Sequence, residues 1–355
     1  MKKLPVPVHV VEIIVVIVLL ILLPVHQANA LEQSNHTKNV AVILSSSTFY
    51  HNYRHTTNAL AIYQSLKNHG GFTDDNIILM MADEVACNAR NPYKESIFPV
   101  GFHHVDLYED VQVDYTGADV TVDNFFRVLL GRHEQFTPAY QQLLNIDEDT
   151  NLFLYATGHG GDSFFKFRDV EDFTTKDLRG VFEQLQIMKR FRSVLFMSDT
   201  CQAFTTAPNT HVENDDSYGG VVLENVYSIS SSLKDENSYS HHSDPNIGHS
   251  VMDRYVFNFV IHMGGFGSSA TGKWQEMDQL SLKSAMVDSM YESNGRSKLG
   301  ANVGWSDLGC ETQMSEVPLS DFLVMRRPFH EEENDDESGI LLIEDYVDLF
   351  DSSSY

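Results

Sequence analysis

Cysteine and positive charge are both scarce in this chain of 355 residues. Its three cysteines are too few for a disulfide-rich scaffold, and the odd count leaves at least one thiol without a partner in the chain. Lys and Arg number 24 against 50 Asp and Glu, which gives a formal net charge of −26. Phosphate contacts need clustered basic side chains, so we expect no nucleic-acid partner. Hydrophobic residues still make up 42% of the chain, enough for a sizeable core.

A long hydrophobic run occurs only near the N-terminus. Two lysines precede an apolar run over residues 13–23, and residues 28–30 (Ala-Asn-Ala) fit a small-x-small cleavage site. This pattern is typical of a secretory signal peptide, which we predict over residues 1–30. The alternative is an uncleaved membrane anchor, although Glu12 and two prolines interrupt the extended run. After cleavage the mature chain is expected to lie in the secretory lumen without a transmembrane helix.

The remaining chain divides by composition into three predicted parts. Residues 31–265 carry the alternating strand and helix patterns of an α/β domain. Residues 266–330 are predicted to be an irregular extension, and residues 331–355 an acidic, disordered tail. The single glycosylation sequon places a predicted glycan on Asn35, close to the new N-terminus.

Short apolar runs rich in β-branched residues alternate with segments of helical periodicity. A strand, a helix and a strand in close succession form a βαβ unit, whose strands are parallel. The sequence therefore predicts an α/β fold with a mainly parallel central sheet flanked by helices. The predicted strands are residues 39–44, 77–82, 152–156, 193–197 and 221–228, and the predicted helices are residues 56–69, 253–262 and one that opens at Thr174 and Thr175.

Two of the predicted strands end in residues that carry chemistry. His159-Gly160-Gly161 follows one strand, and Asp199-Thr200-Cys201-Gln202 follows the next. Because neighbouring parallel strands end at one edge of a sheet, we expect His159 and Cys201 to lie close together. An imidazole beside a thiol favours nucleophilic catalysis, and the backbone N–H groups of Gly160 and Cys201 are a candidate oxyanion hole. A core thiol beside a structural histidine, in a binding domain, is the alternative that the residues alone leave open.

These two motifs resemble the legumain-type clan of cysteine peptidases. Four further segments resemble the family of GPI-anchor transamidase catalytic subunits: residues 52–55 (NYRH), 82–92 (ADEVACNARNP), 113–115 (VDY) and 252–255 (MDRY). The likeness covers residues 38–265 and implies a caspase-like, legumain-like α/β fold.

The resemblance implies an enzyme of the endoplasmic reticulum that cleaves the C-terminal GPI signal of a proprotein. Cys201 would attack the carbonyl of the attachment residue, His159 would move the proton, and Asn52 would orient the imidazole. The ethanolamine amine of a GPI glycolipid would then resolve the thioester as a new amide. This chemistry requires no cofactor.

The resemblance also implies contacts beyond the catalytic residues. Arg54, Ser231 and Ser232 match positions expected to line the substrate cleft. Cys87 matches a position expected to form a disulfide with another subunit of a membrane-bound complex, and a free surface thiol is the alternative. Attachment to the membrane would come from those partner subunits. Cys310 lies outside the resemblance and has no predicted role.

A structural calcium site is implied at Asp74 and Asp114. Calcium takes six or more oxygen ligands, several of them anionic. Gln112 stands where a third carboxylate is expected. A pair of solvated carboxylates is therefore the alternative.

Two other functions remain open at the level of sequence. A legumain-like luminal endopeptidase would use the same cysteine and histidine with water as the acceptor. A non-catalytic scaffold subunit would bind the complex or its substrate without chemistry, although the intact set of Asn52, His159 and Cys201 argues against it.

Overall fold

The computed structural model describes most of the chain between residues 38 and 324, and these described residues belong to one compact unit. The described ranges are 38–99, 105–143, 146–210, 221–241, 243–266, 274–276 and 279–324. The predicted signal peptide (1–30), the sequon at Asn35 and the predicted acidic tail (331–355) lie outside them. Within the described ranges, no helix is both long enough and apolar enough to cross a bilayer.

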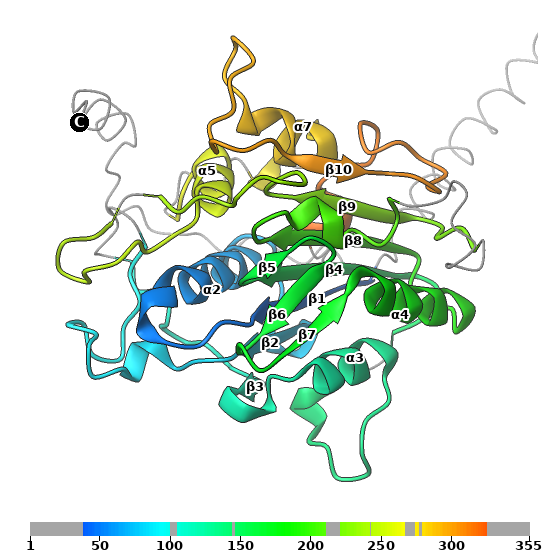
Figure 1. Ribbon diagram of the computed structural model, residues 1–355. Coiled ribbons are helices and arrows are strands. Elements are labelled where there is room, and N and C mark those ends of the chain that lie inside the picture. The colour runs from blue at the N-terminus through cyan, green and yellow to red at the C-terminus, as the bar shows by residue number, and fades with distance from the viewer. Residues whose placement is uncertain are drawn as a thin grey trace, which may run out of the picture. The chain divides into compact units, whose positions relative to one another are not determined.

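Seven strands form the central sheet, in the order β10-β9-β8-β4-β1-β2-β3 (Figure 1). Every neighbouring pair is parallel except β10 with β9, at one edge. This arrangement confirms the predicted fold class, a mainly parallel sheet in an α/β fold. The strands are β1 (Lys38–Ser45), β2 (Ile77–Met81), β3 (Tyr115–Thr116), β4 (Thr150–Thr157), β8 (Ser193–Asp199), β9 (Val226–Ser230) and β10 (Gly304–Ser306).

Helices cover both faces of this sheet, which explains why its inner strands are apolar along almost their whole length. Successive side chains of a strand point to opposite faces, so Ala41 and Ile43 of β1 join one core, and Val40, Val42 and Leu44 join the other. The first core is closed by α2 (Tyr53–Asn68), α5 (Arg254–His262), α7 (Leu282–Met286) and α8 (Ser320–Leu323), and the second by α3 (Val122–Leu130) and α4 (Thr175–Ile187).

A small second sheet lies over the α3–α4 side and was not predicted from the sequence. It consists of β5 (Gly160–Gly161), β6 (Phe164–Phe167) and β7 (Glu171–Thr174), paired antiparallel in that order. Phe165, Phe167 and Phe173 of this sheet are buried in the second core. The sheet begins directly after His159, so its packing fixes the backbone that carries this residue.

Several predicted boundaries change in the structure. The strand predicted to begin at residue 221 begins at Val226, and α2 begins at Tyr53, three residues earlier than the predicted helix. Helix α4 opens at Thr174 as predicted, where the side chains of Thr174 and Asp177 cap each other's backbone N–H groups. The predicted domain boundaries remain predictions. Within the predicted extension (266–330), β10 joins the central sheet and α7 packs in the first core.

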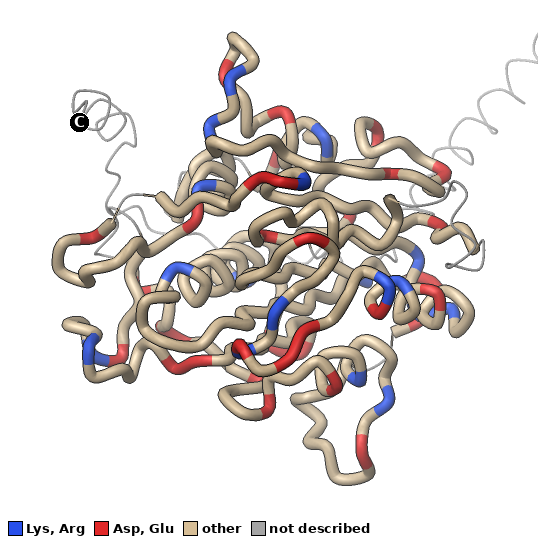
Figure 2. Tube along the Cα trace, viewed as in Figure 1, with Lys and Arg blue, Asp and Glu red and all other residues tan. Residues whose placement is uncertain are grey.

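The excess of acidic side chains is spread along the chain. Figure 2 shows Asp and Glu positions on many loops of the described trace and on the β7 segment, with Lys and Arg scattered between them. Such a distribution favours solubility through mutual repulsion, at some expense to the compact state.

Two glycines provide a test of the packing at the end of α2. A Cβ on Gly70 would meet the backbone carbonyl oxygens of Leu323 and Leu66, whereas a Cβ on Gly180, inside α4, would meet nothing within 4 Å. We predict that Gly70→Ala lowers the free energy of unfolding by about 1–3 kcal/mol through overpacking. Gly180→Ala, the matched control, should raise it by up to about 1 kcal/mol through helix propensity. Thermal unfolding of both variants checks this, and equal melting temperatures would contradict the described packing of Leu323.

Candidate active site

The three predicted catalytic residues follow one row of paired strand residues. Ser45 of β1 pairs with Thr157 of β4, and Thr157 pairs with Asp199 of β8. The ladder continues beyond this row, since Ser46 N donates to Thr157 O (3.0 Å) and Gly158 N to Asp199 O (3.3 Å). His159 and Cys201 each lie two residues past this row. The sheet therefore brings both of them to the same carboxyl edge, where open α/β sheets place their sites.

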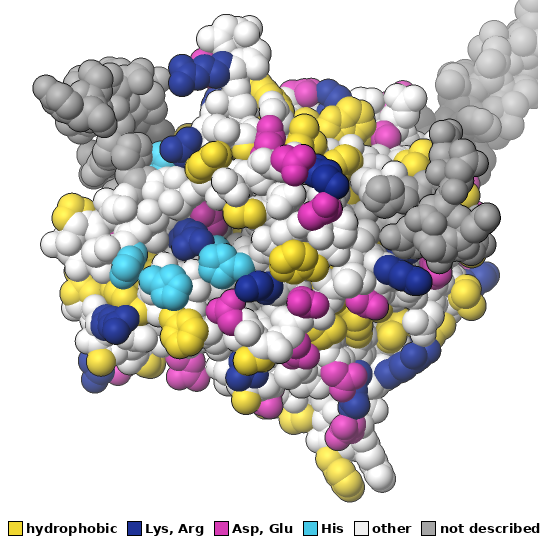
Figure 3. All heavy atoms as spheres, viewed as in Figure 1, with side chains coloured by type: hydrophobic (Ala, Val, Ile, Leu, Met, Phe, Trp, Pro, Cys, Tyr) yellow, Lys and Arg dark blue, Asp and Glu magenta, His cyan; other side chains and the backbone are white. Residues whose placement is uncertain are grey.

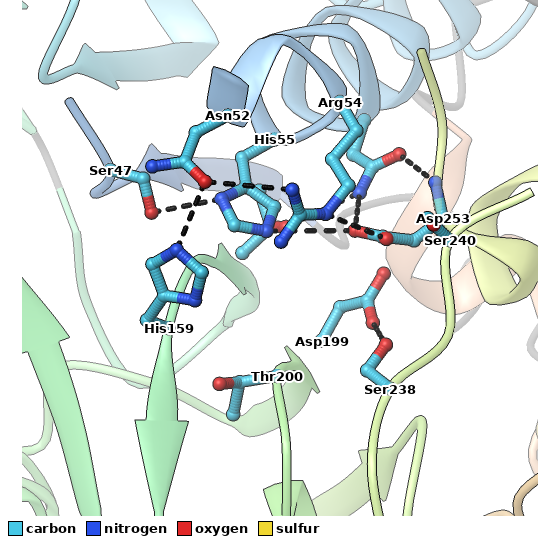
Figure 4. Close-up of polar contacts among 12 residues, drawn as sticks. Ser47, Asn52, Arg54, His55, His159, Asp199, Thr200, Ser238, Ser240 and Asp253 are labelled. Atoms are coloured by element: carbon cyan, nitrogen blue, oxygen red, sulfur yellow. Dashed lines mark hydrogen bonds and ion pairs between the residues drawn. The ribbon is translucent and has the colours of Figure 1, made fainter. Parts of the chain in front are cut away.

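Asn52 and His159 are in direct contact. Asn52 stands at the start of α2, and its Oδ1 lies 2.9 Å from Nε2 of His159 (Figure 4). The amide orientation follows from its other contact, because Nδ2 of Asn52 donates to the carbonyl of Thr48 (2.7 Å). Oδ1 is thus an acceptor facing the ring, so Nε2 carries the proton. The neutral imidazole then has its free lone pair on Nδ1.

The surroundings of His159 favour its neutral form. Burial and the nearby Arg54 guanidinium lower the pKa of His159 below its ordinary value of 6.5. The ring also meets the ring of His55 edge-on, at 5.1 Å between centroids. Burial and the same guanidinium lower the pKa of His55 well below its ordinary value, and its Nδ1 lies 2.8 Å from Ser47 Oγ. A neutral imidazole near pH 7 is the form that accepts a proton from a thiol.

The face that carries His159 is open to solvent in part. Figure 3 shows a group of histidine side chains on the face of the molecule that it draws, with Lys or Arg and hydrophobic side chains beside them. His51 is exposed and His159 is half-buried. Cys201 is likewise half-buried and is not in a disulfide. A substrate from solution therefore has access to this edge of the sheet.

Arg54 is held in place by buried carboxylate and amide groups. Its Nε lies 3.2 Å from Oδ1 of Asp253, and Nδ2 of Asn58 lies 2.6 Å from Oδ2 of the same carboxylate (Figure 4). Asn58 Oδ1 in turn accepts from the backbone N–H of Asp253 (3.0 Å). Asp253 is 2% exposed, and a carboxylate buried to this extent destabilises the fold unless a positive charge or hydrogen-bond donors face it. These contacts fix the guanidinium beside Asn52 and His159.

Asp199 is a second buried carboxyl group, two residues before Cys201. Burial and the neighbouring Asp253 raise its pKa to about 7. Arg54 contacts Asp253 directly, whereas Asp199 Oδ1 accepts a hydrogen bond from the hydroxyl of Ser238 (2.8 Å). Asp199 is therefore the carboxyl group of this pair that holds its proton as pH rises toward 7.

The backbone after His159 comes unusually close to the loop that carries Cys201. A Cβ on Gly160 would lie 2.7 Å from Oγ1 of Thr200 and 2.9 Å from the carbonyl of Phe164. Only glycine fits there without displacing Thr200, which precedes Cys201 in the chain. The two residues predicted to form an oxyanion hole, Gly160 and Cys201, are thus on segments in van der Waals contact. The oxyanion hole itself stays a prediction.

Ser231 and Ser232 are buried beneath the same loop. Both hydroxyls point at the backbone carbonyl of Thr200, at 3.5 Å and 2.9 Å respectively. Their exposed fractions are 2% and 0%. The structure thus brings these residues to the site, in contact with the chain beside Cys201. Their predicted contact with substrate stays a prediction, as does that of Arg54.

The other two cysteines differ in accessibility. Cys87 is exposed at the end of a short 3-10 turn (Val85–Cys87), open to a partner, and its predicted intersubunit disulfide remains a prediction. Cys310 is half-buried, and burial with the nearby Asp307 raises the pKa of its thiol to about 12. A thiol with so high a pKa is a poor nucleophile at neutral pH.

The two carboxylates of the predicted calcium site already have partners. Asp74 accepts from the hydroxyl of Tyr63 and forms an ion pair with Lys67 (3.1 Å), and Asp114 accepts from the amide of Gln112 (3.0 Å) and from Leu79 N (2.8 Å). Within the described ranges, no three His, Cys, Asp or Glu side chains gather at one point in a way that could hold a metal ion. Two carboxylates fall short of the six or more oxygens that calcium takes, so further ligands would be needed, and the calcium site stays a prediction.

Three residues of this site were not assigned a role from the sequence: Asn58, Asp253 and His55. Asp253 lies in the MDRY motif at residues 252–255, which the sequence identified only as a family resemblance. His55 lies in the NYRH segment at residues 52–55, which was likewise identified only as a family resemblance. Asn58 occurs inside a helical pattern, where a polar residue at an apolar position is the only available signal. The hydrogen bonds between Asn58 and Asp253 depend on the packing of α2 against the start of α5, which a periodicity does not reveal.

A half-buried cysteine and a neutral histidine oriented by an amide define a cysteine-peptidase type of site. The sequence matches the model of the peptidase C13 family over residues 39–266. The match spans well over half of the chain, so the chain belongs to the peptidase C13 family. The family resemblance predicted from the motifs is thereby confirmed.

Among the relatives, proteins named GPI-anchor transamidase stand out. The chain is 37% identical over 307 residues to the one from Saccharomyces cerevisiae, covering 85% of this chain and 68% of the yeast protein. It is 44% identical over 246 residues to that of Schizosaccharomyces pombe, covering 69% and 61%. It is 38% identical over 262 residues to that of Homo sapiens, covering 74% and 63%. A solved structure, caspase-1 from Spodoptera frugiperda, superimposes with a TM-score of 0.44 and 8% identity, covering 78% of this chain and 88% of that one.

The electrostatic link between Arg54 and His159 leads to a titration test. We predict that Arg54→Gln raises the pKa of His159, because it removes a positive charge and leaves Asp253 unpaired nearby. Titration of ¹³C-labelled histidine by NMR measures this pKa, and the exposed Arg132→Gln is the control. A lower pKa of His159 in Arg54→Gln than in the unmutated protein would contradict the described environment.

Proposed function

We propose that this chain is the catalytic subunit of a GPI-anchor transamidase. In this reaction the C-terminal GPI signal of a proprotein is cleaved, and the new carboxyl end is joined to the ethanolamine amine of a GPI glycolipid. The proposal is supported chiefly by the identity with transamidases of two yeasts and a mammal over most of the chain. It is supported also by the strand register that aligns His159 with Cys201.

In the first half of the reaction, Cys201 acts as the nucleophile. Nδ1 of His159 accepts the thiol proton, and sulfur forms a bond to the carbonyl carbon of the attachment residue. The carbon–nitrogen bond to the signal peptide then breaks, and His159 returns the proton to the departing amine. The N–H groups of Gly160 and Cys201 stabilise the oxyanion that forms between these steps. The product is a thioester on Cys201 and a free signal peptide.

In the second half, the ethanolamine amine attacks the thioester carbonyl. His159 accepts a proton from the attacking nitrogen and donates one to the departing sulfur, so Cys201 is regenerated as a new amide forms. Asn52 acts through His159, because its Oδ1 holds Nε2–H and thereby keeps the free lone pair on Nδ1. The neutral state of His159 at pH 7 suits this proton transfer.

The setting of the enzyme is part of the same proposal. We propose that the chain works in the lumen of the endoplasmic reticulum, within a membrane-bound complex whose other subunits hold it at the bilayer. The exposed Cys87 supports a disulfide to one of those subunits. The substrates are then proproteins with a C-terminal GPI signal and the GPI glycolipid.

An endopeptidase of the same family would share every step except the acceptor, which would be water. The two functions are separated by the identity of the new C-terminus. We predict that the purified native assembly, given a GPI-signal proprotein and hydrazine, produces a hydrazide at that terminus. Mass spectrometry of the product detects it. A free carboxylate even at high hydrazine concentration would support the endopeptidase instead.

The role of Cys201 has its own control within the chain. Cys201→Ala should abolish both cleavage and hydrazide formation while the assembly stays intact. Cys310→Ala should retain both, because its thiol contacts Val226 at the start of β9, whereas His159 and Cys201 follow the carboxyl ends of the strands. For both variants, gel filtration measures whether the assembly is intact, and mass spectrometry of the product measures cleavage and hydrazide formation. Full activity of Cys201→Ala would support a scaffold whose active residues lie in another subunit.

A further inference from the structure

We propose that Ser232 is a positioning residue for Cys201, and that it acts through the nucleophile loop rather than through the substrate. The nucleophile loop is the segment from Thr200 to Phe204. The inference rests on the proposed function, because it concerns how the reacting thiol is held. It gives Ser232 a role different from the cleft-lining role that the family resemblance implies.

Three hydrogen bonds join Ser232 to the nucleophile loop on both sides of Cys201. Its hydroxyl donates to the carbonyl of Thr200 (2.9 Å) and accepts from the N–H of Ala203 (3.1 Å). Its own carbonyl accepts from the N–H of Phe204 (3.0 Å). One serine thus fixes the residue before Cys201 and the two residues after Gln202. Within the described ranges, the hydroxyls of Ser231 and Thr206 each bond one of the two residues Thr200 and Ala203, whereas that of Ser232 bonds both.

The hydroxyl of Ser232 has no donor left for a substrate. A serine hydroxyl carries a single hydrogen, and here that hydrogen is used on Thr200. The side chain is 0% exposed, so a ligand in the cleft does not reach it. Ser231 differs, because its hydroxyl lies 3.5 Å from the same carbonyl, at the limit of a hydrogen bond. The strong contact in this pair of serines is therefore the one made by Ser232.

The nucleophile loop needs such support because its backbone turns sharply. Gln202, directly after Cys201, has φ of 53°, in the left-handed region that residues with a side chain rarely adopt. A turn of this kind takes backbone groups out of the strand ladder, and buried backbone groups without partners destabilise the fold. Ser232 supplies partners to Thr200 O and Ala203 N, the two groups on either side of the turn.

Ser232 is itself anchored by the strand that precedes it. Strand β9 ends at Ser230, and Ser231 N continues the ladder to Ser198 O of β8 (3.1 Å). In the segment that follows β9, the carbonyl of Glu236 accepts a hydrogen bond from the N–H of Gln202 (2.9 Å). The Glu236 carboxylate in turn accepts from the backbone N–H of Asn302 (2.7 Å). The position of the thiol thus depends on β9 and its following loop, in addition to β8.

The test is the variant Ser232→Ala in the native assembly, with Ser228→Ala as the matched control. Ser228, within β9, is a fully buried serine like Ser232, and its hydroxyl donates to the side-chain oxygen of Asn209 (2.7 Å) instead of to the nucleophile loop. Both variants lose one buried serine hydroxyl. Only Ser232→Ala removes a contact to the nucleophile loop, so a difference between the two reports on positioning and not on stability alone.

Two readouts are measured on each variant. The first is kcat and KM for the proprotein, where we expect Ser232→Ala to lower kcat at least about tenfold with little change in KM, because small displacements of a nucleophile reduce rate steeply. The second is alkylation of Cys201 by iodoacetamide, followed by peptide mass spectrometry. We expect the reactivity of Cys201 to fall at about pH 6.5, where His159 must take the proton from a correctly placed thiol, and to be retained at about pH 9, where hydroxide can take it instead. Ser232→Thr, which keeps the hydroxyl, should recover part of both.

Three results would overturn the proposal. A raised KM with unchanged kcat in Ser232→Ala would assign Ser232 to substrate binding. Equal losses in Ser228→Ala and Ser232→Ala would reduce its role to stability. Failure of Ser232→Ala to assemble, with Ser228→Ala assembled, would assign it to folding. Alkylation needs no proprotein or glycolipid, so this readout holds even if the proposed transamidase reaction fails.

Discussion

The register between β1, β4 and β8 decides where the reacting groups of this protein lie. Ser45, Thr157 and Asp199 form one row across three neighbouring parallel strands, and the segments that carry Asn52, His159 and Cys201 leave the sheet from that row. A shift of one residue in either pairing would exchange the side chains that the strand presents to the two cores, and so disrupt the packing of both. The two cores on either side of the sheet therefore keep the catalytic residues aligned as well as the fold.

The buried carboxyl groups near His159 reduce the stability of the fold, but they belong to the surroundings that keep His159 neutral for proton transfer. Asp199 and Asp253 are both buried, and burial raises the pKa of each. An acid whose folded pKa is raised stabilises the fold below its ordinary pKa near 4, and that contribution is lost as pH rises through the folded value. For Asp199 the loss extends from about pH 4 to about pH 7. Arg54 offsets the charge of Asp253 and, together with burial, keeps His159 neutral.

Much of the fold followed from the sequence because its strands are buried on both faces and read as continuous apolar runs. The strands around residues 39–44, 152–156 and 193–197 were identified in this way, and their carboxyl ends placed His159 and Cys201 together. The small sheet β5–β7 was missed, because its strands are short and its phenylalanines pack against α3 and α4 from a distant part of the chain. The periodicity of a sequence does not indicate such a contact between distant segments.

The residues of the site also differ in whether the sequence alone could identify them. His159 and Cys201 were identified because each lies in a short distinctive motif directly after a predicted strand. Asn58 and Asp253 were not assigned, because their hydrogen bonds join α2 to the start of α5 across 195 positions of sequence. The role of Ser232 is also a property of the fold, since its hydrogen bonds to Thr200 and Ala203 arise only when β9 pairs with β8.

The central claim is that Cys201 carries the acyl group between the two halves of the reaction. The most direct measurement is to mix the native assembly with a GPI-signal proprotein without any amine, stop the reaction in acid, and map the chain by peptide mass spectrometry. The account predicts that the N-terminal part of the substrate is attached as a thioester to the peptide that contains Cys201. Substrate attached to Cys87 or Cys310 instead, or cleavage with no covalent adduct while the assembly is active, would contradict it.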